Sequence, residues 1–174
     1  LSLCKTLKLS QIDIIGTSGG SIVALNLAMQ NPSIVDHIIA DSSPGNYLTK
    51  NEVSVIKAER EQSKKTSMAD YWKHIHGPDW ERVIDLDTEM LARVAGNNLP
   101  LLVGDLSVIS GPVLFTGSLK DETIPHIEGK VAELALQIKK SMVLLFPAGY
   151  HPFLISRNQE FRSITQKFLN DDLL

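Results

Sequence analysis

The sequence predicts an α/β protein in which a parallel sheet is flanked by helices and interrupted by a helical insertion. Four short, mostly apolar runs occur in the 174 residues, at 12–15, 34–40, 113–117 and 142–146. Such runs are typical of strands that are buried on both faces. Helical spacing of apolar residues follows each run, and alternating strands and helices favour a parallel sheet. The block 47–105 is helical in pattern and has no strand-like run, so we expect an insertion there.

The N-terminal part reads as a helix end, a strand, a tight turn and a helix. The strand at 12–15 stops at the glycine-rich stretch 16–20, and the helical spacing covers 21–29. Asn31-Pro32 ends that helix, because the residue before a proline disfavours helical backbone. The second strand, 34–40, closes in the turn cluster 41–46.

The insertion is predicted to contain two to four helices, with breaks at Gly77-Pro78 and at 96–98. After it we expect a strand at 113–117, an amphipathic helix at 127–138, a strand at 142–146, a loop at 147–152 and a C-terminal helix. The predicted domains are therefore a core of 1–46 and 106–174 and a helical insertion of 47–105.

Composition narrows the function classes. The chain is 43% apolar and 21% charged, with a net charge of -3, which is ordinary for a globular protein and gives no electrostatic reason to bind nucleic acid or an anionic membrane. We expect a small-molecule substrate. Cys4 is the one cysteine, so an intramolecular disulfide and a multi-cysteine metal site are excluded, and we expect a cytoplasmic protein. The longest apolar runs are too short to span a bilayer.

The strongest chemical motif is Gly16-Thr17-Ser18-Gly19-Gly20, which fits G-x-S-x-G between a predicted strand and a predicted helix. The turn is so sharp that the positions two before and two after the serine must lack bulk. It presents the Ser18 hydroxyl as a nucleophile at the start of a helix, with the Gly19 N–H as an oxyanion donor. The alternatives are a plain tight loop or a phosphate cradle, and the latter lacks the Lys-Ser/Thr of a P-loop.

A serine nucleophile needs a base and an orienting carboxylate. His151 follows the last predicted strand and Asp121 follows the strand at 113–117, so both lie at the same edge of the sheet as Ser18. Glu122 is an alternative acid if the loop is shifted. Asp41 also ends a strand and is the reserve candidate.

The remaining histidines have structural interpretations. His37 lies inside a strand and is expected in the core, and His126 is expected to start a helix. His74 and His76, two apart on a helix, point to different sides and make a poor metal pair. We expect neither a metal nor a cofactor.

Three segments together resemble the α/β-hydrolase family. The turn at 16–20 looks like its nucleophile elbow, 111–125 like its acid-loop segment with Lys120 before Asp121, and 146–154 like its histidine loop, in which Gly-x-His follows the last strand. The resemblance implies a Ser18-His151-Asp121 triad, a partial fold holding strands 5–8 of the family sheet, and a lid formed by 47–105. The lid looks similar to that of small-ester hydrolases of the carboxylesterase and valacyclovir-hydrolase kind.

The resemblance also implies a missing part. The family takes a second oxyanion amide from a His-Gly loop, and no His-Gly precedes Ser18. We therefore expect a fragment of a longer hydrolase with little turnover by itself, or a homodimer through the apolar edge strand at 12–15. The alternatives for function are a non-catalytic ligand-binding module, or a lyase or acyltransferase that uses the same triad. Several large residues of the lid are expected to form a helical core, with a pocket lining as the alternative: Met68, Tyr71, Trp72, Trp80 and Met90.

Overall fold

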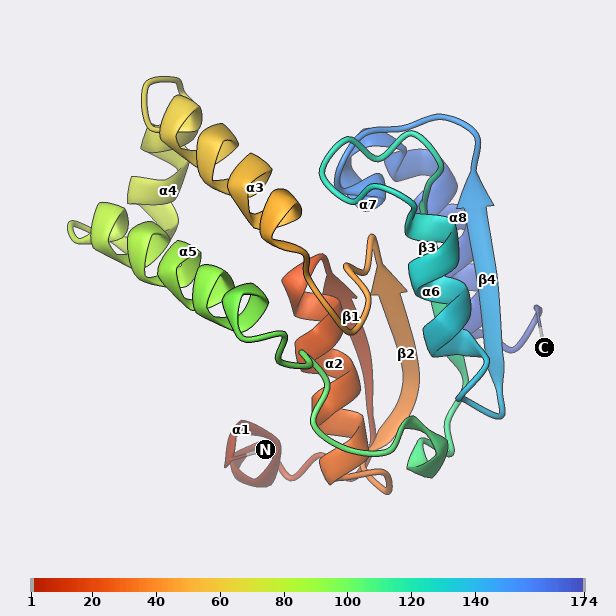
Figure 1. The fold of residues 1–174 in the computed structure, drawn as a ribbon. Coiled ribbons are helices and arrows are strands. Elements are labelled where there is room, and N and C mark those ends of the chain that lie inside the picture. The colour runs from red at the N-terminus through yellow and green to blue at the C-terminus, as the bar shows by residue number, and fades with distance from the viewer. Residues whose placement is uncertain (1, 174) are drawn as a thin grey trace. The chain divides into compact units, whose positions relative to one another are not determined.

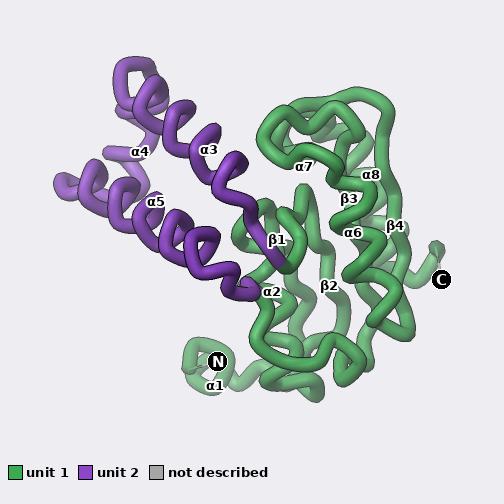
Figure 2. The backbone as a smooth tube through the Cα atoms, in the orientation of Figure 1, with its two compact units in different colours: residues 1–46, 102–174 green, residues 47–101 purple. Residues whose placement is uncertain are grey.

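A computed structural model describes residues 2–173, which fall into two compact units, 2–46 with 102–173 and 47–101 (Figure 2). The first unit contains a four-stranded parallel sheet in the order β1-β2-β3-β4, formed by Ile12–Thr17, Val35–Asp41, Val113–Ser118 and Ser141–Phe146. The prediction of an α/β fold with a parallel sheet is confirmed. All four carboxyl ends lie at one edge of the sheet.

Helices cover both faces of this sheet. Figure 1 shows α2 (Gly19–Gln30) and α6 (Ile127–Ala135) on one face and α8 (Asn158–Leu169) on the other. The helices α1 (Ser2–Thr6) and α7 (Phe153–Ser156) and the 3-10 turn η1 (Leu106–Val108) are short. The strands are buried where helices cover both faces, which explains their continuous apolar character.

The core on the α8 face is built from aromatic and aliphatic side chains. Ile39 of β2 and Leu114 of β3 pack against Phe153, Phe161 and Phe168 of the last two helices, and all five are buried. The predicted helix 127–138 is shorter than expected. After Ala135 the backbone forms hydrogen bonds three residues apart, from the Gln137 N–H to the Leu134 carbonyl and from the Ile138 N–H to the Ala135 carbonyl. Ile138 is nevertheless buried.

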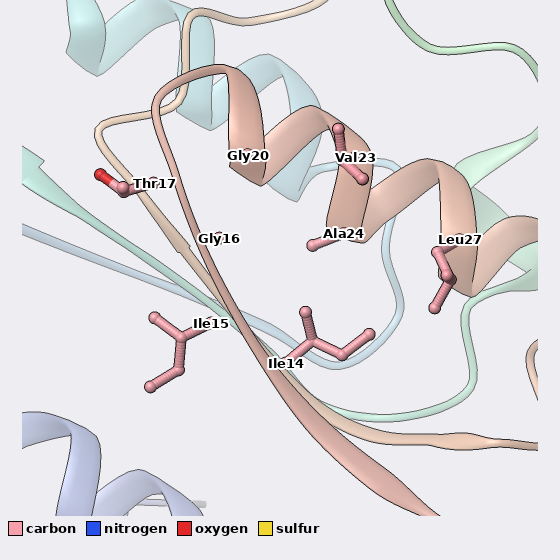
Figure 3. Close-up of a pocket in the computed structure, with 8 residues that line it drawn as sticks. All are labelled: Ile14, Ile15, Gly16, Thr17, Gly20, Val23, Ala24 and Leu27. Atoms are coloured by element: carbon pink, nitrogen blue, oxygen red, sulfur yellow. The ribbon is translucent and has the colours of Figure 1, made fainter. Parts of the chain in front are cut away.

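The strand β1 lies at the edge of the sheet in the described part of the chain, as predicted. Ile15 is 50% exposed and Val23 of α2 is 66% exposed. Between this strand and α2 lies an apolar hollow of about 440 Å³ that Gly16 and Gly20 also border (Figure 3). An uncovered strand edge can pair with another strand. Dimerisation through β1 stays a prediction.

The second unit consists of the helices α3 (Lys50–Ser63), α4 (Met68–His76) and α5 (Trp80–Gly96), so the prediction of helices without a strand is confirmed. A capping box of Thr49 and Glu52 starts α3. Trp72 and Trp80 pack with ring centroids 5.9 Å apart. The expected helical core is only partly present, because none of the five large residues proposed for it is fully buried. Their role in lining a pocket, and the lid itself, stay predictions.

No helix among residues 2–173 is both long enough and apolar enough to cross a membrane.

Candidate active site

Ser18 occupies a strained turn between β1 and α2. Its backbone has φ 52° and ψ -125°, a region that residues with a side chain rarely adopt and that costs about 1–3 kcal/mol. Surrounding bonds hold it there. The Ser18 N–H donates to the Asp41 carbonyl at 2.9 Å, and the Ser21 hydroxyl donates to the Ser18 carbonyl at 2.6 Å. The turn therefore presents the hydroxyl in a fixed direction.

The two glycines that flank this turn play different parts (Figure 3). A Cβ at Gly16 would lie 2.3 Å from the Gly20 carbonyl oxygen, so only glycine lets β1 approach the start of α2. A Cβ at Gly20 would meet no described atom within 4 Å, because this residue borders the apolar hollow beside β1. The expectation that both positions must lack bulk is confirmed for Gly16 and wrong for Gly20.

The structure brings Ser18, His151 and Asp121 together from three strand ends. The distance from His151 Nε2 to Ser18 Oγ is 3.0 Å, and that from His151 Nδ1 to Asp121 Oδ2 is 2.9 Å. A carboxylate only accepts hydrogen bonds, so Nδ1 carries the hydrogen and Nε2 is left to accept the hydroxyl proton of Ser18. This is the geometry of a nucleophile, a base and an orienting acid.

Asp121 is oriented by its own loop. Its side chain has no exposed surface, and its Oδ1 accepts backbone N–H groups of Thr123 at 3.1 Å and Ile124 at 2.8 Å. The other oxygen therefore remains for His151. Among the three candidate acids, Asp121 is the one that contacts the imidazole.

The alternative acids have other partners. Glu122 accepts the backbone N–H of His151, at 3.2 Å to Oε1 and 3.1 Å to Oε2. Asp41 is fully buried and accepts the hydroxyls of Thr17 and Thr116 and the N–H of Leu154, at 2.9, 2.8 and 3.2 Å.

Asp41 carries a shifted pKa. Burial raises the pKa of its carboxyl above the usual value, and the three hydrogen bonds together with the nearby His151 only partly offset this. No motif in the sequence predicts these donors to Asp41. A small polar residue at a strand end, such as Thr17 or Thr116, is the signal that could have suggested a buried polar network.

The first helical residue after Ser18 supplies an amide. Gly19 is the first residue of α2, and the amides of a first helical turn have no acceptor within the helix. Together with the helix dipole, that N–H favours negative charge beside the serine. Thr17 lies on the other side of Ser18 and points to Asp41 through its hydroxyl.

One group of side chains in the described residues has metal-ligand spacing, namely Asp13, Asp36 and His37. It lies at the amino ends of β1 and β2, at the opposite edge from Ser18. His37 is buried as predicted for a core residue, but it is not apolar in its contacts. Its ring bonds Asp13 at 2.9 Å and Asp171 at 3.3 Å and packs edge-on against Phe168.

The chain is similar to a curated serine hydrolase and to solved structures of hydrolases. No protein-family profile matches the chain. It is 26% identical over 176 residues to the mouse protein serine hydrolase BPHL. The matched region covers 97% of this chain and 58% of the mouse protein. The chain therefore spans less than two thirds of the length of this curated relative.

Solved structures share the architecture over nearly the whole chain. A serine hydrolase of the bacterium Cycloclasticus zankles has a TM-score of 0.69 at 18% identity, with 98% of this chain and 68% of that chain covered. The esterase EaEST of Exiguobacterium antarcticum has a TM-score of 0.66 at 18% identity, with 97% and 70% covered. The meta-cleavage product hydrolase CumD of Pseudomonas fluorescens has a TM-score of 0.67 at 14% identity, with 98% and 68% covered.

The chain shares the α/β-hydrolase fold of these solved structures. The predicted fold class is thereby confirmed. That the turn around Ser18 is a nucleophile elbow, with Gly16, Thr17, Gly19 and Gly20 as its other members, stays a prediction. That β1 to β4 are the last four strands of the superfamily's sheet stays a prediction.

Proposed function

We propose that the protein is a serine hydrolase that cleaves a small carboxylic ester or a related acyl bond through an acyl-enzyme. The single observation that carries this proposal is the hydrogen-bonded chain from Ser18 Oγ to His151 Nε2 and from His151 Nδ1 to Asp121, at 3.0 and 2.9 Å. It starts at a strained turn, and backbone strain is concentrated at functional sites.

In the first half-reaction His151 takes the proton of Ser18 while Oγ forms a bond to the acyl carbon. Asp121 keeps the imidazole in the correct tautomer and stabilises the imidazolium that forms. The tetrahedral intermediate collapses when the bond to the alcohol breaks, and the alcohol leaves with the proton held on Nε2. The product of this step is an ester of Ser18.

In the second half-reaction water replaces the alcohol. His151 takes a proton from water, the hydroxide oxygen bonds to the acyl carbon, and the bond to Ser18 Oγ breaks with return of the proton to Oγ. In both halves the carbonyl oxygen becomes negative. The Gly19 N–H at the start of α2 is the proposed donor to this oxygen.

The net charge of the chain and the names of the similar proteins both support a small-molecule substrate. A net charge of -3 offers no attraction to nucleic acid or to an anionic membrane surface. The relatives include a protein named an esterase and one named a meta-cleavage product hydrolase, so both substrate types belong in a screen. A cytoplasmic location is part of the proposal, supported by the single cysteine.

A fluorophosphonate probe tests the proposal, because it modifies a serine only when a base activates the hydroxyl. We expect the protein to be labelled on Ser18, and we expect Ser18→Ala to abolish labelling. Ser33→Ala is a matched control, since Ser33 is an exposed serine of the turn between α2 and β2. An unlabelled wild-type protein, or equal labelling of Ser18→Ala, would contradict the enzyme proposal and favour a ligand-binding module. Product analysis with a panel of acyl donors separates hydrolase from lyase or acyltransferase.

A further inference from the structure

The loops that carry Asp121 and His151 are tied together at two points besides the contact between these two residues. One tie is buried. The Ser118 hydroxyl donates to the Gly149 carbonyl at 2.9 Å and accepts the Lys120 N–H at 3.1 Å, and Ser118 has no exposed surface. The other tie is exposed and acts on His151 itself, because Glu122 accepts its backbone N–H through both carboxylate oxygens. Two adjacent side chains of one loop thus hold one histidine.

The two acidic residues hold different parts of His151. Asp121 bonds the ring at Nδ1, and Glu122 bonds the backbone amide at 3.1 and 3.2 Å. A hydrogen bond to the ring alone leaves the Cα of the histidine free to shift with its loop, since residues 147–152 lie outside any helix or strand. Fixing the amide as well restricts both the position and the direction of the imidazole. Nε2 is then held toward Ser18.

We propose that Glu122 is a positioning residue, which acts on the reaction through His151 and not by contact with substrate. The inference rests on the proposed function. Glu122 accepts the amide of His151 and thereby keeps Nε2 at hydrogen-bond distance from Ser18 Oγ. Ser118 holds the loop of His151 at a second point, through the carbonyl of Gly149, two residues before the histidine. Loss of Glu122 therefore leaves this loop attached but releases the amide of His151.

Two variants separate positioning from an effect of charge. Glu122→Gln keeps a carbonyl oxygen that can accept the His151 N–H but removes the negative charge, whereas Glu122→Ala removes the acceptor. Glu133→Ala is the matched control, because Glu133 is an exposed glutamate on α6. We expect Glu122→Ala to lower the rate of fluorophosphonate labelling by about tenfold to a hundredfold, the loss that follows a displacement of up to 1 Å. Glu122→Gln should label close to the wild-type rate, and kcat should fall in Glu122→Ala with KM unchanged.

A second readout is independent of activity. Hydrogen exchange of the His151 amide, followed by NMR, should be slow in the wild type and in Glu122→Gln and faster in Glu122→Ala. If Glu122→Ala is labelled at the wild-type rate, the positioning role is overturned and the proposed function stays intact. Equal losses in both variants overturn it in favour of charge. An unlabelled wild-type protein overturns the proposed function. In that case amide exchange still tests the hydrogen bond from the His151 N–H to Glu122, and exchange that is unchanged in Glu122→Ala overturns it.

Discussion

Replacement of Gly16 by alanine should disable the nucleophile turn. A Cβ at this position would lie 2.3 Å from the Gly20 carbonyl oxygen, 2.6 Å from its carbonyl carbon and 2.8 Å from the Ser21 nitrogen. All three atoms belong to the backbone, so no side chain can rotate away. Carbon and oxygen atoms that do not bond approach to about 3.3 Å, and the start of α2 must therefore move from β1 by about 1 Å.

The size of the effect follows from this displacement. Overpacking of a tight contact costs about 1–3 kcal/mol in the free energy of unfolding. A shift of about 1 Å in a reacting group lowers a rate by about 10²-fold. Because Ser18 lies between the strand and the displaced helix, we expect Gly16→Ala to lower the free energy of unfolding by about 1–3 kcal/mol and the rate of labelling by about 10²-fold. Urea unfolding measures the first, and the rate of fluorophosphonate labelling measures the second.

Gly20→Ala is the matched control in the same turn. Its Cβ would meet no described atom within 4 Å, so it should keep the wild-type labelling rate and gain up to about 1 kcal/mol in stability through a less flexible unfolded chain. Wild-type stability and labelling in Gly16→Ala would refute the argument from close approach. Equal losses in both variants would show that the turn needs small residues on both sides.

Three further results are expected. Asp121→Asn should lower kcat by up to about 10⁴-fold. The Thr123 and Ile124 amides bind the Asn oxygen, so its NH₂ turns toward His151 and forces the wrong tautomer of the imidazole. Steady-state hydrolysis of an ester measures kcat, and a small loss would contradict this expectation. Burial disfavours protonation of His37, but the hydrogen bonds that its ring donates to Asp13 and Asp171 raise its pKa overall. The stability it adds is complete below the unfolded pKa of about 6.5 and is lost as the pH rises through the folded pKa, so wild type and His37→Gln should differ more in urea at pH 6 than at pH 9. Burial raises the pKa of Asp41, so its contribution is complete below about pH 3.9 and is lost as the pH rises through the folded pKa; Asp41→Asn should lose more stability relative to wild type at acidic than at neutral pH, and a constant difference would argue against this shift.

The sequence by itself determined the class of the fold, and it pointed to Ser18 as the nucleophile, which stays a prediction. Strand and helix periods are local properties, so the alternation of buried strands and helices could be read directly. The same holds for the turn at 16–20, whose requirement for glycine at Gly16 comes from neighbours only four residues away. The order Ser18, Asp121, His151 came from the resemblance to the α/β-hydrolases, and the strand ends predicted that all three lie at one edge of the parallel sheet.

Only the tertiary structure decided which carboxylate faces the imidazole. Asp121 and Glu122 are neighbours in the chain, yet one reaches the His151 ring and the other its amide, because adjacent side chains leave the backbone in different directions and the loop conformation sets which is which. Asp41 ends a neighbouring strand but is turned toward Thr17 and Thr116. These choices depend on strand register and on contacts between residues far apart in the chain, which no local pattern encodes.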